Sequence, residues 1–363
     1  MMQLFKLLLV YLCSLGLSTG GLAPSDAFLG MPGGLRSNLD HIESTKNVGP
    51  RWAIGPNKFV ELDDTEFSLT HKGYSPKYKS NPREIFHSDP SVPDRWDWRD
   101  HGIVGPVKNQ AQCGSCWAFS AVSPLESRLT NATGKNVTLS EQEMVDCVRN
   151  ILAPDNSSTC CDGCQGGEMY SVYQYLLEKR HGKDDTEKEY PYEAVDQDCN
   201  VVPSTVKLRL ARYVQLPQNE VAIKQALYRE GPISVGVDAN TDWQLYTGGI
   251  YDPNNETCDP TTLDHGVVLV GYGAEKGLDY WIVRNSWGKD WGEKGYIRLA
   301  RGNNACGVAS SAIYPVLEPK LKSLFDSCHD DCGNACSSGP CGSCSNLCCG
   351  CGCNTCRCCS IPN

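Results

Sequence analysis

Residues 113 to 120 read CGSCWAFS, which places two cysteines three positions apart at the start of an apolar segment. Such a pair could be half of a zinc site, a redox-active dithiol, or one structural cysteine beside one nucleophile. A thiolate attacks a carbonyl group far better than a thiol does, so a nucleophilic cysteine needs surroundings that lower its pKa. Cys116 begins a predicted helix, where the helix dipole and the free N–H groups favour a negative sulfur. Cys116 is therefore the candidate nucleophile.

Other side chains could complete the machinery for hydrolysis of an amide bond. His265, in LDHGVVLVGYG, could stabilise the thiolate as an ion pair and later protonate the leaving amine. Asn285, in RNSWG, could orient the imidazole, and Trp287 could shield that contact from water. Gln110 lies six residues before Cys116 and, with the backbone N–H of Cys116, could form an oxyanion hole.

The segments that carry these residues predict helices first and strands afterwards. Apolar residues at helical intervals predict helices from Cys116 onward, over residues 139–147 and over residues 169–180. In the second of these, Ser140 lies three residues before Glu143, which is the spacing of a capping box. Runs rich in β-formers predict strands at residues 232–239, 265–273, 280–288 and 295–301. This order favours an α+β protein with two packed halves and a site between them.

Pro124 interrupts the helix that would carry the nucleophile. It lies eight residues after Cys116. A proline inside a helix removes one backbone hydrogen bond and costs about 3 kcal/mol or more unless the structure accommodates it. We expect either a kink at this position or a helix that is rescued by its burial.

The order and context of these motifs resemble those of the papain family of cysteine peptidases, of the cathepsin L and F kind. The sequence CGSCW at residues 113–117, followed downstream by the histidine and asparagine motifs, matches the signature of that family. The resemblance covers residues 92–316. It implies a papain-like two-domain fold of the α+β class, in which a helical left half and a β-barrel-like right half enclose the active cleft.

The resemblance implies a cysteine-type endopeptidase, a hydrolase made as a zymogen that uses no cofactor and no metal. Cys116 and His265 would be the catalytic pair, oriented by Asn285, with Gln110 in the oxyanion hole. Two other functions remain open. One is a disulfide oxidoreductase that uses Cys113 and Cys116, although such an enzyme would not need the downstream histidine and asparagine. The other is an inactive peptidase-like scaffold that displays the C-terminal tail.

The resemblance also implies how a substrate would bind. Gly167 could pair with the backbone of an extended peptide because no side chain intervenes. The small, uncharged residues Gly236 and Ser311 imply a roomy pocket that prefers a bulky apolar side chain before the scissile residue. We expect Glu168 to be a solvated charge at the rim of this pocket. The complete set of implied substrate-binding residues is Gly166, Gly167, Met169, Gly236, Leu263, Gly266, Trp287 and Ser311.

Three disulfides follow from the resemblance, namely Cys113–Cys164, Cys147–Cys199 and Cys258–Cys306. Cys160 and Cys161 are left in an insertion, where they could pair with each other, exchange with a neighbouring bridge or reach outside the domain. A zinc site also fits the spacing superficially, but it would sequester the nucleophile; its ligands would be Cys113, Cys116, Cys161 and Cys164.

Several features indicate export from the cytoplasm. Residues 1–20 have the apolar core and small residues of a secretory signal peptide. Twenty-two cysteines favour an oxidising compartment. With a net charge of -10 and no long basic run, nucleic acid is not an expected partner. We expect a monomer without a membrane anchor, in a lysosome-like compartment or outside the cell, that acts on proteins and peptides. The glycosylation sequons begin at Asn131, Asn136, Asn156 and Asn255.

Cysteine usage and the extent of the resemblance together divide the rest of the chain into a propeptide at residues 21–91, a peptidase domain at 92–316 and a Cys-rich extension at 317–363. The spacing of Gly55, Asn57, Phe59 and Glu61 resembles a propeptide motif of the family. The segment is polar, is broken by Gly and Pro, and lacks the usual upstream half. We therefore expect a removable or loosely folded segment, and a propeptide that acts as the chain's own inhibitor, although a weak one.

The extension has twelve cysteines between residues 328 and 359 and few large apolar side chains. It cannot build a hydrophobic core, so cross-links must supply its order. We expect a small module with six disulfides. A metallothionein-like thiolate cluster has suitable ligand spacing, but the export route would oxidise its thiols before they could bind metal.

Overall fold

The structure is a computed structural model, and it separates into two compact units, Met1–Val316 and Leu317–Asn363, which are described individually below. The predicted signal peptide and the sequons at Asn156 and Asn255 lie outside the described residues. Among the residues that the structure describes, no helix has both the length and the apolar character needed to cross a membrane. The described residues are 33–45, 51–76, 89–152, 159–207, 209–253, 257–318, 348–352 and 355–359.

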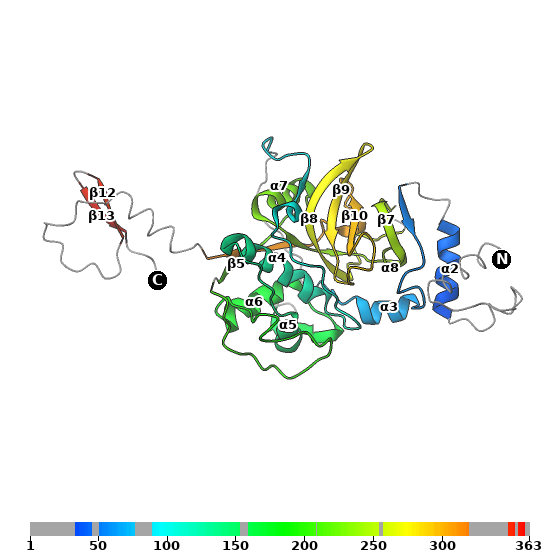
Figure 1. Ribbon diagram of the computed structural model, residues 1–363, viewed down its shortest axis with the longest axis horizontal. Helices are drawn as coiled ribbons and strands as arrows, with labels where there is room; N and C mark the ends of the chain where they lie inside the picture. Colours follow the sequence, from blue (N-terminus) through cyan, green and yellow to red (C-terminus); the bar gives the residue numbers. More distant parts are fainter. Residues whose placement is uncertain are drawn as a thin grey trace, which may run out of the picture. The chain divides into compact units, whose positions relative to one another are not determined.

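Three helices lie together on one side of the central strands of the first unit (Figure 1). They are α4 (Cys116–Thr133), α5 (Glu141–Cys147) and α6 (Met169–Lys179). The sequence predicts all three helices, and the structure confirms them. The other helices are α2 (Gly33–Thr45), α3 (Asp64–His71), α7 (Glu220–Glu230) and α8 (Thr241–Leu245), with short 3-10 turns at Trp98–His101, Gly163–Gln165 and Ala305–Gly307.

The second layer is a large sheet with the strand order β1-β7-β10-β9-β8-β6-β11-β5, and β2 pairs with β8. Strands β6, β8, β9 and β10 confirm the four runs that the sequence predicts. In the sheet, His265 at the start of β8 pairs with Val237 at the end of β6. The strands are β1 (Trp52–Ile54), β2 (Trp96–Asp97), β5 (Leu210–Gln215), β6 (Ile233–Val237), β7 (Tyr246–Tyr251), β8 (His265–Glu275), β9 (Leu278–Arg284), β10 (Tyr296–Ala300) and β11 (Ala312–Leu317).

The described part of residues 21–91 packs tightly on the sheet side of the molecule. Phe59 and Phe67 belong to the same buried cluster as Trp243, Trp287 and Trp291. Strand β1 adds to the sheet by pairing antiparallel with β7. The Asn57 side chain donates to the carbonyl of Gln244 at 2.7 Å, which explains why the motif needs an asparagine there. The expectation of a loosely folded segment is therefore wrong for these residues, because aromatic side chains provide the packing that the polar composition concealed.

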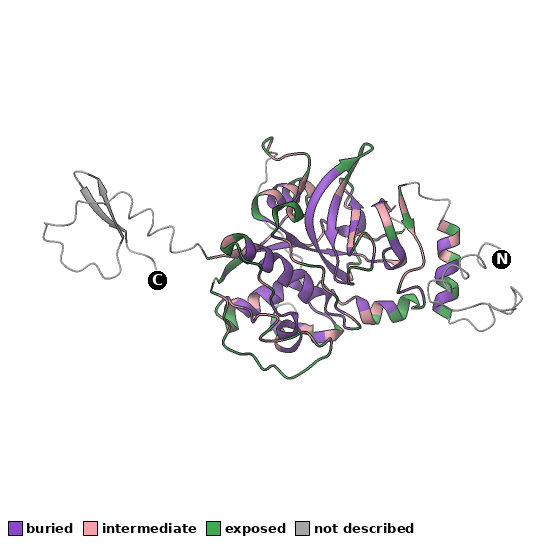
Figure 2. Cartoon of the chain, in the orientation of Figure 1, coloured by how far each residue is buried: buried purple, intermediate pink, exposed green. Residues whose placement is uncertain are grey.

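Helix α4 runs through Pro124 without interruption and is buried along most of its length (Figure 2). Proline has no N–H, so the carbonyl of Ser120, four residues earlier, loses its partner within the helix. The hydroxyl of Ser234, on strand β6, donates to that carbonyl at 2.6 Å. A side chain from the sheet thus replaces the missing backbone bond, and the helix is rescued by its packing.

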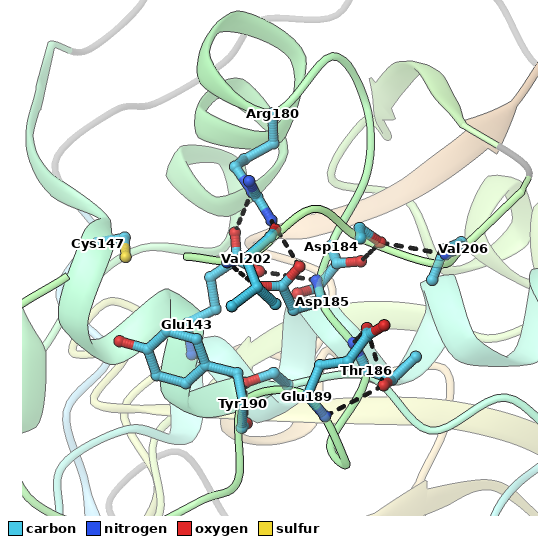
Figure 3. A network of polar contacts seen from close by, with 12 residues as sticks. Glu143, Cys147, Arg180, Asp184, Asp185, Thr186, Glu189, Tyr190, Val202 and Val206 are labelled. Carbon is cyan, nitrogen blue, oxygen red and sulfur yellow. Dashed lines mark hydrogen bonds and ion pairs between the residues drawn. The ribbon is translucent and has the colours of Figure 1, made fainter. Parts of the chain in front are cut away.

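A buried polar network ties α5 to the end of α6 (Figure 3). Ser140 caps α5 by accepting from the backbone N–H of Glu143 at 2.9 Å. The Glu143 carboxylate does not return to Ser140; it accepts from Arg180 and from the backbone of Asp185, each at 2.7 Å. The carboxyl of Asp184 adjoins that of Glu143, and both are buried. Only half of the predicted capping box forms, because Glu143 joins this network instead.

The insertion after α5 forms a hairpin of β3 (Arg149–Leu152) and β4 (Thr159–Asp162). In the second unit, the described backbone forms another antiparallel hairpin, of β12 (Cys348–Gly352) and β13 (Thr355–Cys359). Its register sets Cys348 opposite Cys359 and Cys351 opposite Cys356. The disulfide module expected for the extension stays a prediction.

Candidate active site

Cys116 is the first residue of α4 and is fully buried. Of the cysteines whose side chains the structure describes, it is the one with a free thiol. The carbonyl oxygen of Cys116 lies against β8, since a Cβ added at Gly266 would be 3.1 Å from it. The start of the helix and the start of β8 therefore meet, and His265, next to Gly266, is brought to the thiol.

The imidazole of His265 is held on two sides. Its Nε2 lies 2.8 Å from Oδ1 of Asn285, an acceptor, so the proton of the neutral ring belongs on Nε2. Trp287 stacks on the ring with a centroid distance of 4.5 Å. The other ring nitrogen, Nδ1, is buried and has no hydrogen-bond partner. This arrangement leaves Nδ1 available to exchange a proton with Cys116.

Gln110 is fully buried beside the nucleophile. Its Nε2 donates to the carbonyl of Cys113 at 2.8 Å and to that of His71 at 3.2 Å. Its Oε1 accepts from the hydroxyl of Ser286 at 2.6 Å, which fixes the direction of the amide. Sequence reasoning missed Ser286 as a positioning residue, although it lies inside the RNSWG motif between Asn285 and Trp287.

Residues 71–76 of the N-terminal segment cross the cleft over these groups. The backbone N–H groups of Gly73 and Tyr74 donate to the carbonyl of Asp264 at 3.0 and 2.9 Å. Gly167 donates to the carbonyl of Gly73 at 2.8 Å, and Ser75 donates to that of Gly167 at 3.2 Å. The segment runs parallel to the strand-like stretch at Gly167. It covers the site, and the weak inhibition expected from a short propeptide stays a prediction.

Three contacts of this segment were not foreseen from the sequence. The carbonyl of His71 accepts from the side chains of both Gln110 and Trp287. Lys72 is 7% exposed and pairs with Asp264 at 3.0 Å. Gly73 lies so close to Gly114 that an added Cβ would be 1.9 Å from its carbonyl oxygen. No local motif signals these contacts, because each joins distant parts of the chain.

Burial favours the uncharged forms of Cys116 and His265 while residues 71–76 cover them. Burial raises the pKa of the Cys116 thiol to about 12, although backbone N–H groups near the sulfur oppose this shift. Burial also lowers the pKa of His265 to about 3, against the opposing effect of the hydrogen bond to Asn285. A thiol and a neutral imidazole are therefore the stable forms here. Burial by the segment therefore disfavours the thiolate–imidazolium pair that is expected from the sequence.

The side chain of Tyr74 is buried and forms one wall of a cavity. Met169, Leu263 and Ser311 also line this cavity. Gly236 lies against the ring, because its added Cβ would be 2.4 Å from Cε1 of Tyr74. Gly266, in contrast, contacts Cys116 and Ser120. Of the substrate-binding residues that the resemblance implies, Met169, Gly236, Leu263 and Ser311 therefore lie around Tyr74 and the cavity that it lines.

The glycines of the GCQGG motif let other parts of the protein lie very close to the backbone. Gly166 has a φ of 124°, and a Cβ there would lie 2.7 Å from the carbonyl oxygen of Gly73. At Gly167 a Cβ would lie 2.4 Å from the ring of Trp117. The next residue, Glu168, is 2% exposed, so the expected solvated charge at the rim is wrong. Its carboxyl group instead interacts with Tyr170 at the wall of the pocket.

The structure contains the three expected bridges and joins Cys160 to Cys161. Cys113 therefore pairs with Cys164 and not with Cys116, which removes the dithiol that an oxidoreductase would use. Three of the four sulfurs of the alternative zinc site are in disulfides. Of the sequons, Asn131 and Asn136 lie on the exposed surface at the end of α4 and just after it.

Comparison with known proteins agrees with this geometry. Residues 92–316 match the family model described as papain family cysteine protease. The chain is 40% identical over 279 residues to a cathepsin L of Sarcophaga peregrina, a match that spans 73% of this chain and 79% of that protein. It is 41% identical over 282 residues to digestive cysteine proteinase 3 of Homarus americanus, spanning 77% and 84% of the two chains.

Solved structures give the same result. The structure of a digestive procathepsin L2 from Tenebrio molitor larval midgut superimposes with a TM-score of 0.71 at 34% identity, covering 86% of this chain and 99% of that chain. A recombinant stem bromelain precursor gives a TM-score of 0.70 at 31% identity, covering 87% and 100%. These matches confirm the α+β fold class expected from the sequence.

Proposed function

The chain belongs to the papain family of cysteine proteases, and on this basis we propose that it is an endopeptidase made as a zymogen for secretion or for a lysosome-like compartment. Residues 1–20 would be its signal peptide, 21–91 its inhibitory propeptide, 92–316 its protease domain and 317–363 a separate extension. Exposed sequons at Asn131 and Asn136 are consistent with passage through the secretory pathway.

In the proposed mechanism, removal of the propeptide opens the cleft to water. The Cys116 thiol then transfers its proton to Nδ1 of His265, and the resulting thiolate attacks the scissile carbonyl carbon. The oxyanion of the tetrahedral intermediate accepts hydrogen bonds from Nε2 of Gln110 and from the backbone N–H of Cys116. The intermediate collapses as the C–N bond breaks, and His265 protonates the departing amine.

The second half of the reaction hydrolyses the thioester left on Cys116. His265, again neutral, takes a proton from a water molecule as the water attacks the acyl carbon. This second tetrahedral intermediate collapses as the C–S bond breaks, which releases the carboxylic acid and leaves Cys116 as a thiolate again. Asn285 holds the imidazole in one tautomer and orientation through both steps and leaves its positive charge uncompensated, which a carboxylate would not do.

One observation carries the proposal. Residues 71–76 occupy the cleft through main-chain hydrogen bonds to Asp264 and Gly167, which is how an extended peptide substrate would be held. The carbonyl of His71 in that segment accepts a hydrogen bond from the side-chain amide of Gln110. This amide is the donor that we assign to the oxyanion. The site thus already engages a peptide backbone at the positions that the chemistry requires.

The proposed substrate is a protein or peptide with a bulky, largely apolar residue before the scissile residue. Support comes from the cavity that Tyr74, Met169 and Leu263 line together. The small residues Gly236 and Ser311 leave the space that a large side chain needs.

The test is activation of the purified full-length chain at acidic pH, followed by hydrolysis of fluorogenic peptides. We expect cleavage near Ser91–Val92, seen by N-terminal sequencing, together with the appearance of peptidase activity. Alkylation of Cys116 should abolish that activity. A processed protein that has an alkylatable Cys116 but no hydrolysis of any peptide would instead support the inactive scaffold.

A further inference from the structure

The cavity that Tyr74 lines has a polar end. The hydroxyl of Tyr74 lies 2.8 Å from Oγ of Ser311, within hydrogen-bonding distance. Glu168 and Tyr170 line the same pocket, and Glu168 is buried there. The negative charge of Glu168 raises the pKa of Tyr74, second only to burial, so the carboxyl group acts directly on the phenol. A benzyl or isobutyl side chain would bring no hydrogen-bonding atom to this end.

The facing wall suits a flat ring. A Cβ at Gly236 would lie 2.4 Å from Cε1 and 3.0 Å from Cδ1 of Tyr74, closer than real carbon contacts. The ring therefore lies directly on backbone, in space that exists only because residue 236 is glycine. The same added Cβ would lie 3.2 Å from Cδ1 of Leu263, so this side chain closes the slot. A thicker, branched side chain would fit such a slot less well than an aromatic ring.

Gly236, Leu263 and Ser311 all belong to the protease domain, so the slot and its polar end remain after the propeptide is removed. We propose that this pocket selects tyrosine as the residue before the scissile residue, and that Ser311 recognises the phenol hydroxyl. This inference rests on the proposed function and names the substrate class of the same site. Ser311 then determines specificity by touching the substrate.

The size of the selection follows from the pairing of polar groups. A site that hydrogen-bonds a substrate hydroxyl rejects the analogue without it, because its own polar group then loses its partner. Ser311 is only partly buried, so water can replace the phenol in part. We therefore expect a preference of about tenfold for tyrosine over phenylalanine, which is the size of one ordinary hydrogen bond that water can partly replace. The charge of Glu168 acts in the same direction, since it favours a side chain that donates a hydrogen bond.

The experiment uses the processed enzyme and fluorogenic dipeptide amides that differ only in the residue before the scissile residue: tyrosine, phenylalanine, leucine or lysine. We expect kcat/KM to be highest for tyrosine. Ser311→Ala should reduce the tyrosine-to-phenylalanine ratio to about one, through loss of activity on the tyrosine substrate alone. Ser310→Ala is the matched control, because the Ser310 hydroxyl instead donates to the carbonyl of Pro260 at 3.0 Å. It should keep the ratio.

Each other outcome overturns the inference. Equal or faster hydrolysis of the phenylalanine substrate by the unaltered enzyme would mean that Ser311 does not recognise the hydroxyl of tyrosine. Fastest hydrolysis of the lysine substrate would assign the selection to Glu168. Equal loss of the ratio in both serine variants would show a nonspecific effect of the substitution. Failure of the proposed function looks different, because then none of the substrates is hydrolysed.

Discussion

Lys72 and Asp264 form an ion pair across the cleft, with Nζ and Oδ2 3.0 Å apart. Lys72 belongs to the segment that covers the nucleophile, whereas Asp264 directly precedes His265 in the protease domain. The carbonyl of Asp264 also accepts hydrogen bonds from the backbone N–H groups of Gly73 and Tyr74. Asp264, beside the proposed catalytic histidine, therefore holds residues 72–74 through both its side chain and its main chain.

Loss of this ion pair should weaken the hold of the propeptide. Lys72→Met keeps the aliphatic stem but removes the charge, and it leaves a half-buried Asp264 without its partner. We expect the variant to process itself about tenfold faster at a fixed acidic pH, because about 1.4 kcal/mol of the closed state is lost. Gel analysis over time measures this rate. Leu69→Ala, at a position 74% exposed on α3, is the control and should process at the unaltered rate.

Acid should open the cleft, because two histidines make the closed state less stable as the pH falls. Burial lowers the pKa of His265 to about 3 and that of His71 to about 4, from an ordinary value of 6.5. A group whose pKa is depressed in the closed state stabilises that state fully above its ordinary pKa and loses this effect as the pH falls toward the lower value. Processing should therefore accelerate between pH 6.5 and about 4. His71→Phe preserves ring packing on Phe67 and should make this dependence shallower; an unchanged pH profile would contradict the role of His71.

The two cysteines of CGSC should behave differently when replaced. Cys116→Ser should fold and bind peptide but lose essentially all turnover, because a serine hydroxyl at this site does not form an anion readily. Cys113→Ser breaks a bridge that spans 51 residues of sequence, and we expect it to lower the free energy of unfolding by about 4 kcal/mol. Initial-rate kinetics and denaturant unfolding separate the two effects. Near-normal turnover by Cys116→Ser would rule out the nucleophile assignment.

Asn285 should matter less than His265. Asn285→Ala removes the hydrogen bond to Nε2 but leaves the imidazole stacked on Trp287. Orientation is only part of the work of the histidine, so kcat should fall less than in His265→Ala, which removes the proton carrier altogether. Equal losses in the two variants, measured with the same peptide at the same pH, would show that orientation decides the rate.

The protease domain should lose stability as the pH rises. Burial raises the pKa of Asp184 well above its ordinary value, and it raises that of Glu143 as well (Figure 3). Neighbouring Asp185 and Arg180 face the same network, and Arg180 partly offsets the repulsion at Glu143. Carboxyl groups with a raised pKa in the folded state stabilise it at low pH, and this contribution disappears as the pH rises through the raised pKa.

A single substitution tests this dependence. Asp184→Asn places an amide donor beside Glu143 and mimics the protonated acid, so the melting temperature should fall less between pH 5 and pH 7.5 than in the unaltered protein. Glu141, whose pKa burial raises to about 8, near Lys108, Glu126 and Glu187, should account for part of the slope that remains. Asp198→Asn, at an exposed position, is the control and should follow the unaltered protein.

The extension should be separable from catalysis. A chain that ends at Glu318 should hydrolyse peptides at the unaltered rate, because every residue assigned to the site lies before that position. Reduction of the fragment 328–363 should add about twelve hydrogens to its mass if its twelve cysteines form six bridges. Bound zinc and freely alkylated thiols in the native protein would instead establish a thiolate cluster.

The sequence predicts the main helices and strands of the protease domain because each has a clear apolar period and recognisable boundary residues. It also identifies Cys116, His265 and Asn285, since each lies in a distinctive local motif. It does not predict that Tyr74 lies against Gly236 or that Lys72 pairs with Asp264. Those contacts depend on how a separate segment crosses the folded domain, and no periodicity encodes that path. The burial of Glu168 was missed for a similar reason, because its surroundings come from several elements.

The replacement of a backbone hydrogen bond at Pro124 has a consequence for the order of assembly. The carbonyl of Ser120, one turn beyond the nucleophile, finds its donor on Ser234 of strand β6 and not within its own helix. Helix α4 can therefore complete its hydrogen bonding only after the sheet has docked. While the two halves are still apart, water must supply the donor to this carbonyl, so Ser234 replaces a water molecule when the halves pack together. One hydrogen bond of the helix that carries Cys116 is thus made by the assembled domain and not by the helix itself.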